Sequence, residues 1–136
     1  MKILDIAFTG YPVTDIKRAR HFYEEVLGLT PSFLWGDETT AWIEYSIGSG
    51  TLAIGNVAPE WKSTSGGVCI SLEVEDIDAA VETLKKAGVT FHPPTETPVC
   101  FMLFLSDPDG NPLMLHKCKN PEPKSGCCCG DGCGCH

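Results

Sequence analysis

The sequence predicts an α+β fold in which one domain is built from two successive βαβββ modules. Three observations indicate this fold: a segment of the first half recurs in the second half, each copy carries an amphipathic helix with start and stop signals, and short apolar segments flank each helix. The chain has 136 residues, 43% of them hydrophobic, which is enough to bury a core of ordinary size.

The internal repeat consists of VTDIKRARHFYEEVLGL at 13–29 and VEDIDAAVETLKKAGV at 74–89. Four residue types recur with the same spacing. The pairs are Val13 and Val74, Asp15 and Asp76, Ile16 and Ile77, and Ala19 and Ala80. Repetition of one supersecondary unit predicts that both halves have the same order of elements.

Each repeat predicts one helix. Asp15 and Asp76 are placed to cap the unpaired N–H groups of the first turn. Gly28 and Gly88 follow the last apolar position, where a left-handed residue commonly ends a helix. Between these signals the apolar residues keep helical spacing. They are Ile16, Ala19, Phe22, Tyr23, Val26 and Leu27 in the first copy, and Ile77, Ala80, Val81, Leu84 and Ala87 in the second.

Short apolar segments around the helices predict the strands. In chain order they are ILDIAFT, then the first helix, PSFLW, TAWIEYSI and TLAIGN, followed by GVCISLEV, the second helix, TFHPP, CFMLFLS and PLMLHK. DPDGN, between the last two, has the composition of a tight turn. We therefore expect a domain at 1–118, with modules at about 1–60 and 66–118.

The last residues predict an appendage to this domain. Residues 119–126, KNPEPKSG, form a polar linker, and 127–136, CCCGDGCGCH, have too few large apolar groups to fold alone. Thiolates and imidazole are ligands for soft ions such as Zn(II), Cu(I) or As(III). The tail donors are Cys127, Cys128, Cys129, Cys133, Cys135 and His136. The alternative is a tail that binds no metal.

Charge and hydropathy exclude some classes of partner. The net charge is −8 and no basic stripe is present, which argues against nucleic acid and against anionic membrane surfaces. No run of about 18 apolar residues could span a membrane. The N-terminal segment lacks the features of a signal peptide, so we expect a cytoplasmic protein.

Two motifs carry a resemblance to a known family. FYEEVLGL at 22–29 and SDPDGNPLMLH at 106–116, in a tandem βαβββ arrangement, resemble the vicinal oxygen chelate superfamily. This family contains glyoxalase I, extradiol dioxygenases and the fosfomycin- and bleomycin-resistance proteins. The resemblance covers about residues 3–118 and implies a curled mixed sheet around a cleft, in a homodimer. It does not specify an activity, because this fold hosts many.

The resemblance also implies where a metal ion would bind. In metal-using members, His or Glu side chains occupy up to four equivalent positions, which correspond here to Phe8, Ala53, Cys69 and Met114. None of these side chains is an imidazole or a carboxylate suited to a hard divalent ion. We therefore expect a cleft without a metal cofactor, as in the bleomycin-binding members.

Strand alternation counted from these four positions predicts the residues that face the cleft. They are Phe8, Trp42, Glu44, Ala53, Cys69, Ser71, Glu73 and Met114, with His116 at the mouth of the cleft. The first hypothesis is that this cleft binds a small hydrophobic or aromatic molecule, with or without chemistry on it.

Two other hypotheses remain open. The protein could be a lyase or dioxygenase whose rearranged metal site uses Cys69, Glu44 or His116, or a protein that handles soft metal through its tail. A nucleophilic Cys69 needs a lowered pKa, whereas a structural one is simply a small buried residue. Glu44 beside Trp42 could act as an acid, a base or an anchor for a cation, or be merely solvated.

Overall fold

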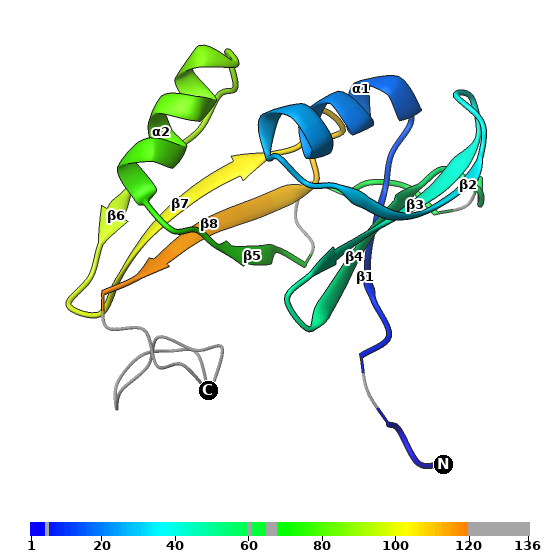
Figure 1. Cartoon of the computed structure of the whole chain (residues 1–136), viewed down its shortest axis with the longest axis horizontal. Helices are drawn as coiled ribbons and strands as arrows, with labels where there is room; N and C mark the ends of the chain where they lie inside the picture. The colour runs from blue at the N-terminus through cyan, green and yellow to red at the C-terminus, as the bar shows by residue number, and fades with distance from the viewer. Residues whose placement is uncertain (5, 60, 65–67, 120–136) are drawn as a thin grey trace. The chain divides into compact units, whose positions relative to one another are not determined.

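The computed structural model describes residues 1–4, 6–59, 61–64 and 68–119 (Figure 1). The chain forms two compact units, Met1–Gly67 with Asp107–Asn111, and Val68–Ser106 with Pro112–His136. Each unit contains a four-stranded mixed sheet and one helical segment. The predicted α+β fold with two similar modules is confirmed.

The sheet of the first unit has the order β1-β4-β3-β2. Its strands are β1 (Thr9–Pro12), β2 (Pro31–Gly36), β3 (Ala41–Ile47) and β4 (Gly50–Gly55). β1 runs parallel to β4, and the two remaining pairs are antiparallel. Because successive side chains of a strand point to opposite faces, every second residue of each strand lies on the same face of this sheet.

The helical segment of the first unit covers one face of its sheet (Figure 1). It begins as α1 (Ile16–Arg20), where the Asp15 carboxylate accepts the Arg18 N–H at 3.1 Å, and continues as a π-helical segment, η1 (His21–Val26). Tyr23 is fully buried and stacks on Tyr45 of β3, with ring centroids 6.0 Å apart. The helix and its cap are confirmed, whereas its π-helical second half was not predicted.

The second unit repeats this plan with the sheet order β5-β8-β7-β6. Its strands are β5 (Ile70–Glu73), β6 (Thr95–Glu96), β7 (Cys100–Ser106) and β8 (Pro112–Cys118). β5 is parallel to β8, and β7 is antiparallel to both β8 and β6. The two sheets thus share one topology, as the sequence repeat predicts.

Helix α2 (Ile77–Lys86) lies over one face of the second sheet (Figure 1). The Asp76 carboxylate accepts the N–H groups of Asp78 and Ala79 at 2.9 and 3.1 Å, which satisfies two donors of the first turn. Gly88, with φ +71°, lies directly after the C-cap. Both predicted signals are confirmed.

Three predicted strands differ from the observed ones. The strand expected over 3–9 is observed only from Thr9, because within the described residues the hydrogen-bonded register with β4 covers Thr9–Pro12 alone. The strand expected over 67–74 begins at Ile70. TFHPP forms only a bridge between Phe91 and Leu105, and the strand β6 follows it, because consecutive prolines cannot donate to a ladder.

The DPDGN turn is confirmed and packs within the first unit. The Asp107 carboxylate accepts the N–H groups of Asp109 and Asn111, each at 2.9 Å, and Gly110 has φ +85°. The Asn111 side chain donates to the carbonyl of Pro12 at 2.9 Å. This bond ties the turn to the end of β1, which is why the turn belongs to the first unit.

Candidate functional site

Five aromatic side chains gather on the face of the first sheet opposite its helix. We call this set the aromatic face: Phe8, Phe33, Trp35, Trp42 and Trp61. The register shows that the strand residues share it, because Phe33 lies opposite Glu44 and Trp35 opposite Trp42. Three of the rings touch: the centroids of Phe8 and Trp42 are 5.2 Å apart, and those of Trp42 and Trp61 are 6.0 Å apart.

Small residues in the sheet allow these rings to lie close to the backbone. A Cβ on Gly10 would stand 3.1 Å from the Trp61 ring, and one on Gly55 would stand 2.8 Å from the Trp42 ring. Ala53 lies opposite Gly10 in the register, two residues before Gly55 in β4, and is fully buried. Larger side chains would lift the indoles off the sheet.

One carboxylate accompanies the rings. The Trp42 indole N–H donates to Glu44 Oε2 at 2.8 Å, which orients both side chains on the same face. A carboxylate among aromatic rings provides an attachment point for a cationic group, since rings and carboxylate both attract positive charge. Glu44 is thus a candidate anchor.

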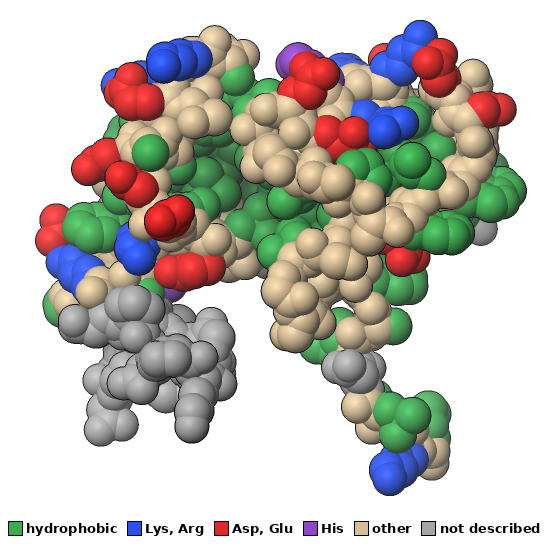
Figure 2. Space-filling model, in the orientation of Figure 1, with side chains coloured by type: hydrophobic (Ala, Val, Ile, Leu, Met, Phe, Trp, Pro, Cys, Tyr) green, Lys and Arg blue, Asp and Glu red, His purple; other side chains and the backbone are tan. Residues whose placement is uncertain are grey.

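Part of the aromatic face is open at the surface. Phe8, Phe33 and Trp35 are all exposed, although large apolar side chains usually cover one another or a ligand. Hydrophobic side chains reach the surface over β2 (Figure 2). Such exposed rings are available to a planar apolar molecule.

The corresponding face of the second sheet carries sulfur and charge. We call it the sulfur-rich face: Cys100, Met102, Met114 and Cys118, with Ser71, Glu73, Phe104 and His116 beside them. Each lies opposite another member of the set in the register, for example Met102 opposite His116 and Ser71 opposite Met114. The face lies away from α2, because Phe101 and Lys117, which line a groove with α2, alternate with these residues.

A carboxylate holds His116 on the sulfur-rich face. His116 Nδ1 lies 2.5 Å from Glu73 Oε1, and Glu73 Oε2 accepts the N–H of Cys118 at 2.8 Å. Both oxygens of Glu73 therefore have partners. The arrangement fixes the imidazole between β5 and β8, and the predicted position of His116 at a cleft mouth is not tested.

Cys69 lacks the electrostatics of a nucleophile. It is half-buried just before β5, and its thiol contacts the carbonyl of Ile70 at 3.5 Å. Burial raises the pKa of the Cys69 thiol, whereas a reactive thiol needs a lowered pKa. This direction favours the structural interpretation of Cys69.

The four positions that the family uses for metal do not fit a hard divalent ion. Phe8 is part of the aromatic face, Ala53 is buried in β4, and Cys69 and Met114 offer only sulfur. Over the described part of the chain, no group of three or more His, Cys, Asp or Glu side chains is placed to hold a metal ion. We derive no metal-dependent step from this donor set. The six predicted tail donors lie outside the described residues.

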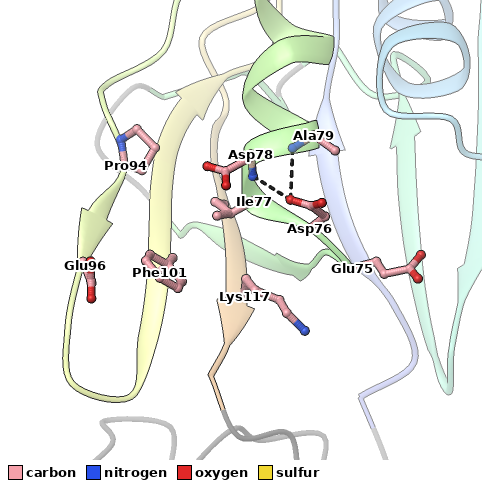
Figure 3. A pocket seen from close by; sticks show the side chains of 9 residues that line it. All are labelled: Glu75, Asp76, Ile77, Asp78, Ala79, Pro94, Glu96, Phe101 and Lys117. Carbon is pink, nitrogen blue, oxygen red and sulfur yellow. Dashed lines mark hydrogen bonds between the residues drawn. The ribbon is translucent and has the colours of Figure 1, made fainter.

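An open groove of about 820 Å³ lies beside the N-terminus of α2 (Figure 3). Its walls include the acidic side chains of Glu75, Asp78 and Glu96, with Phe101 and Lys117 on its floor. The groove lies on the α2 side of the second sheet, on the opposite face from Ser71, Glu73, Met114 and His116. The Asp76 carboxylate already caps the helix N-terminus there, as the dashed lines in Figure 3 show.

The structure groups the predicted residues by unit. The helix-free face of the first sheet carries Phe8, Trp42, Glu44 and Ala53. The helix-free face of the second sheet carries Ser71, Glu73, Met114 and His116. Cys69 precedes β5 and lies two residues before Ser71, so strand alternation assigns it to the same face.

The sequence did not predict the places of Phe33, Trp35 and Trp61 on the first face. It also did not predict those of Cys100, Met102, Phe104 and Cys118 on the second. Pairing β2 with β3 as a hairpin would have placed Phe33 and Trp35, whereas no periodic signal marks Trp61.

The chain contains two mixed sheets of the same topology, and each sheet has a helix on one face and candidate site residues on the other. This arrangement defines the class of protein. The model of the Glyoxalase/Bleomycin resistance protein/Dioxygenase superfamily matches residues 5–115. The chain therefore belongs to this superfamily, as the two sequence motifs suggested. No curated protein sequence matches it.

Solved structures of the same fold include an antibiotic-binding protein and two resistance proteins. TnmS3, an antibiotic-binding protein from Streptomyces sp. CB03234, is 26% identical, with a TM-score of 0.71 over 87% of this chain and 98% of its own. A glyoxalase/bleomycin resistance protein from the same organism is also 26% identical, with a TM-score of 0.67 over 82% and 98%. The fosfomycin resistance protein FosX from Listeria monocytogenes, at 14% identity and TM-score 0.66 over 85% and 94%, shares the fold.

The helices that the structure describes are short. Neither α1 nor α2 has the length and apolar composition that crossing a membrane requires, and the same holds for every other helix of the described residues.

Proposed function

We propose that this protein binds a small aromatic molecule on the aromatic face, without using a metal ion there. The observation that carries the proposal is the cluster of Phe8, Trp42 and Trp61, flanked by the exposed rings of Phe33 and Trp35. Offset and edge-to-face ring contacts contribute about 0.5–1.5 kcal/mol each beyond the burial of apolar area. Several such contacts give useful affinity for one planar ligand.

The relatives support this class of ligand. TnmS3 is described as an antibiotic-binding protein, and a second relative as a glyoxalase/bleomycin resistance protein. Binding of an organic molecule, rather than turnover of it, fits a donor set that offers no imidazole or carboxylate at the family's metal positions. We therefore place sequestration or carriage ahead of catalysis.

The charges of the protein indicate which charge the ligand should carry. Glu44 accepts a hydrogen bond from Trp42 within the aromatic face, and the chain has a net charge of −8. Cations are attracted both to ring faces and to the carboxylate, whereas an anion is repelled by the acidic surroundings. We expect a cationic or neutral aromatic ligand to bind more tightly than an anionic one.

The test compares two neighbouring side chains of β2. Phe33 is 51% exposed and Leu34 is 54% exposed, but they point to opposite faces of the sheet. Phe33→Ala should raise the Kd of a cationic acridine dye about 2- to 10-fold, which is the loss of one aromatic contact. Leu34→Ala, the matched control, should change it less than 2-fold. Fluorescence titration of the full chain measures both values.

Three results bear on the proposal. Equal weakening by both alanine variants, or no binding by the wild type, would contradict a site on the aromatic face. Tighter binding of an anionic anilinonaphthalene sulfonate than of the acridine would contradict the charge preference. Glu44→Gln should weaken the acridine and leave a neutral aromatic probe unaffected, because only the charge is removed.

A further inference from the structure

Two cysteines face each other across the β7–β8 hairpin. Cys100 and Cys118 are direct partners in the antiparallel register. The Lys119 N–H donates to the Val99 carbonyl at 2.9 Å, so the next pair outward is a hydrogen-bonded one. Because the two kinds of pair alternate, Cys100 and Cys118 occupy a non-hydrogen-bonded position.

That position brings the two side chains close together. Cα atoms of a non-hydrogen-bonded pair are about 4.5 Å apart, and their side chains stand on the same face of the sheet. Disulfides span Cα separations of about 4.4–6.8 Å. The ladder thus holds the two residues within bridging distance without movement of the backbone.

The two thiols also share one buried environment. Cys100 is 3% exposed and Cys118 is 2% exposed, both are free thiols, and they pack together with Val99 and Met102. Hydrogen bonds fix both strand ends. Thr97 Oγ1 accepts the Cys100 N–H at 3.0 Å and lies 3.2 Å from its sulfur. Glu73 accepts the N–H of Cys118.

We propose that Cys100 and Cys118 form a reversible disulfide through exchange with a low-molecular-weight disulfide. One cysteine thiolate attacks a sulfur of the small disulfide, releases one small thiol and forms a mixed disulfide. The second cysteine thiolate then attacks the protein sulfur of the mixed disulfide and releases the other small thiol. The net step oxidises two protein thiols and reduces one small disulfide to two thiols.

The position of the pair at the ends of its two strands favours exchange. Because both thiols are buried, attack on a small disulfide requires local opening, and Cys100 is the first residue of β7 and Cys118 the last of β8. Strand ends open more easily than strand centres.

The cysteine pair belongs to the second unit, whereas the aromatic face belongs to the first, and the inference does not depend on the proposed function. The two cysteines form one end of the sulfur-rich face, where the neighbouring pair is Met102 and His116. Oxidation would fix the end of the hairpin beside that histidine. Cys69, which has no cysteine opposite it in the described register, serves as the internal control.

The experiment maps disulfides in the full-length chain. A variant with Ser at the five tail cysteines keeps the tail but removes competing thiols. It is equilibrated with oxidised and reduced glutathione, quenched with N-ethylmaleimide, digested with trypsin and analysed by mass spectrometry. Cleavage after Lys117 separates Cys118 from Cys100, so a disulfide joins two different peptides.

The expected result is the Cys100 peptide linked to the Cys118 peptide, and its release by dithiothreitol. Cys69→Ser should leave this link intact, and Cys118→Ser should abolish it. Recovery of both cysteines as separate maleimide or glutathione adducts, or linkage of either to Cys69 instead, would overturn the proposal. Circular dichroism of the serine-tail sample before digestion, compared with that of the wild-type chain, establishes that the mapped protein is folded, so these outcomes do not depend on a mutant that fails to fold.

Discussion

Asp107 is the residue around which the polar core of the first unit is arranged. Its carboxylate accepts two backbone N–H groups of its own turn, and Oδ2 also accepts the Tyr23 hydroxyl at 2.8 Å and the Asn111 amide at 2.7 Å. Burial, and then the Asp107 carboxylate, raise the pKa of Tyr23 far above its ordinary value. The residue must therefore stay protonated in the folded state.

This pKa shift predicts a loss of stability in alkali. Above about pH 10 the unfolded state releases the tyrosine proton and the folded state keeps it, so the free energy of unfolding falls as pH rises. For Tyr23 the slope is about 1.4 kcal/mol per pH unit, and below pH 10 the contribution is fully present. Urea unfolding at pH 9 and 11 measures it.

The matched control for that measurement is Tyr23→Phe. It removes one ionisable hydroxyl and should make the decline less steep, with Tyr45, whose pKa burial also raises, contributing the remainder. It should also lower the stability at pH 7 by about 1–3 kcal/mol because Asp107 loses a buried donor. An equally steep decline in the phenylalanine variant would show that other groups cause the alkaline loss.

At the scale of elements, cap and turn residues predicted the boundaries of helices and strands better than the composition of the apolar segments did. The Asp and Gly signals bracket both helices where expected. The seven-residue strands β7 and β8 flank the DPDGN turn in the predicted places. The failures have local causes too: TFHPP has the apolar start of a strand but carries two prolines without N–H groups.

The cap of α2 gives a prediction at this scale. Asp76→Ala removes the acceptor for two N–H groups and should lower the free energy of unfolding by about 1 kcal/mol. Asp78→Ala removes the same charge from the same turn without removing a cap acceptor, and should cost only a few tenths of a kcal/mol. Thermal unfolding compares the two variants, and equal losses would attribute the effect to charge alone.

At the scale of the whole molecule, the chain combines a superfamily domain with a cysteine-rich tail. The match ends at residue 115, so family membership does not explain the tail. The homodimer implied by the family stays a prediction. The tail likewise stays a proposed site for soft ions, and its donors are numerous enough for a direct test.

We expect the full-length chain to retain Zn(II) after desalting, and the variant with Ser at Cys127, Cys128, Cys129, Cys133 and Cys135 to lose most of it. Thiolates are the preferred ligands of soft and borderline ions, and these five supply most of the tail donors. Elemental analysis of both proteins provides the measurement. Cys69→Ser should retain the metal; equal retention by the serine-tail variant would place the ion elsewhere.

The sequence by itself determined the fold class, the two helices, the last hairpin and some of the residues on each helix-free face. These features follow from short-range spacing: caps and helix periods span a few residues, and strand alternation has period two. Only the tertiary structure decided which of these residues meet. Trp61 lies against Gly10, and Cys100 lies opposite Cys118, because chain closure and strand register bring distant segments together.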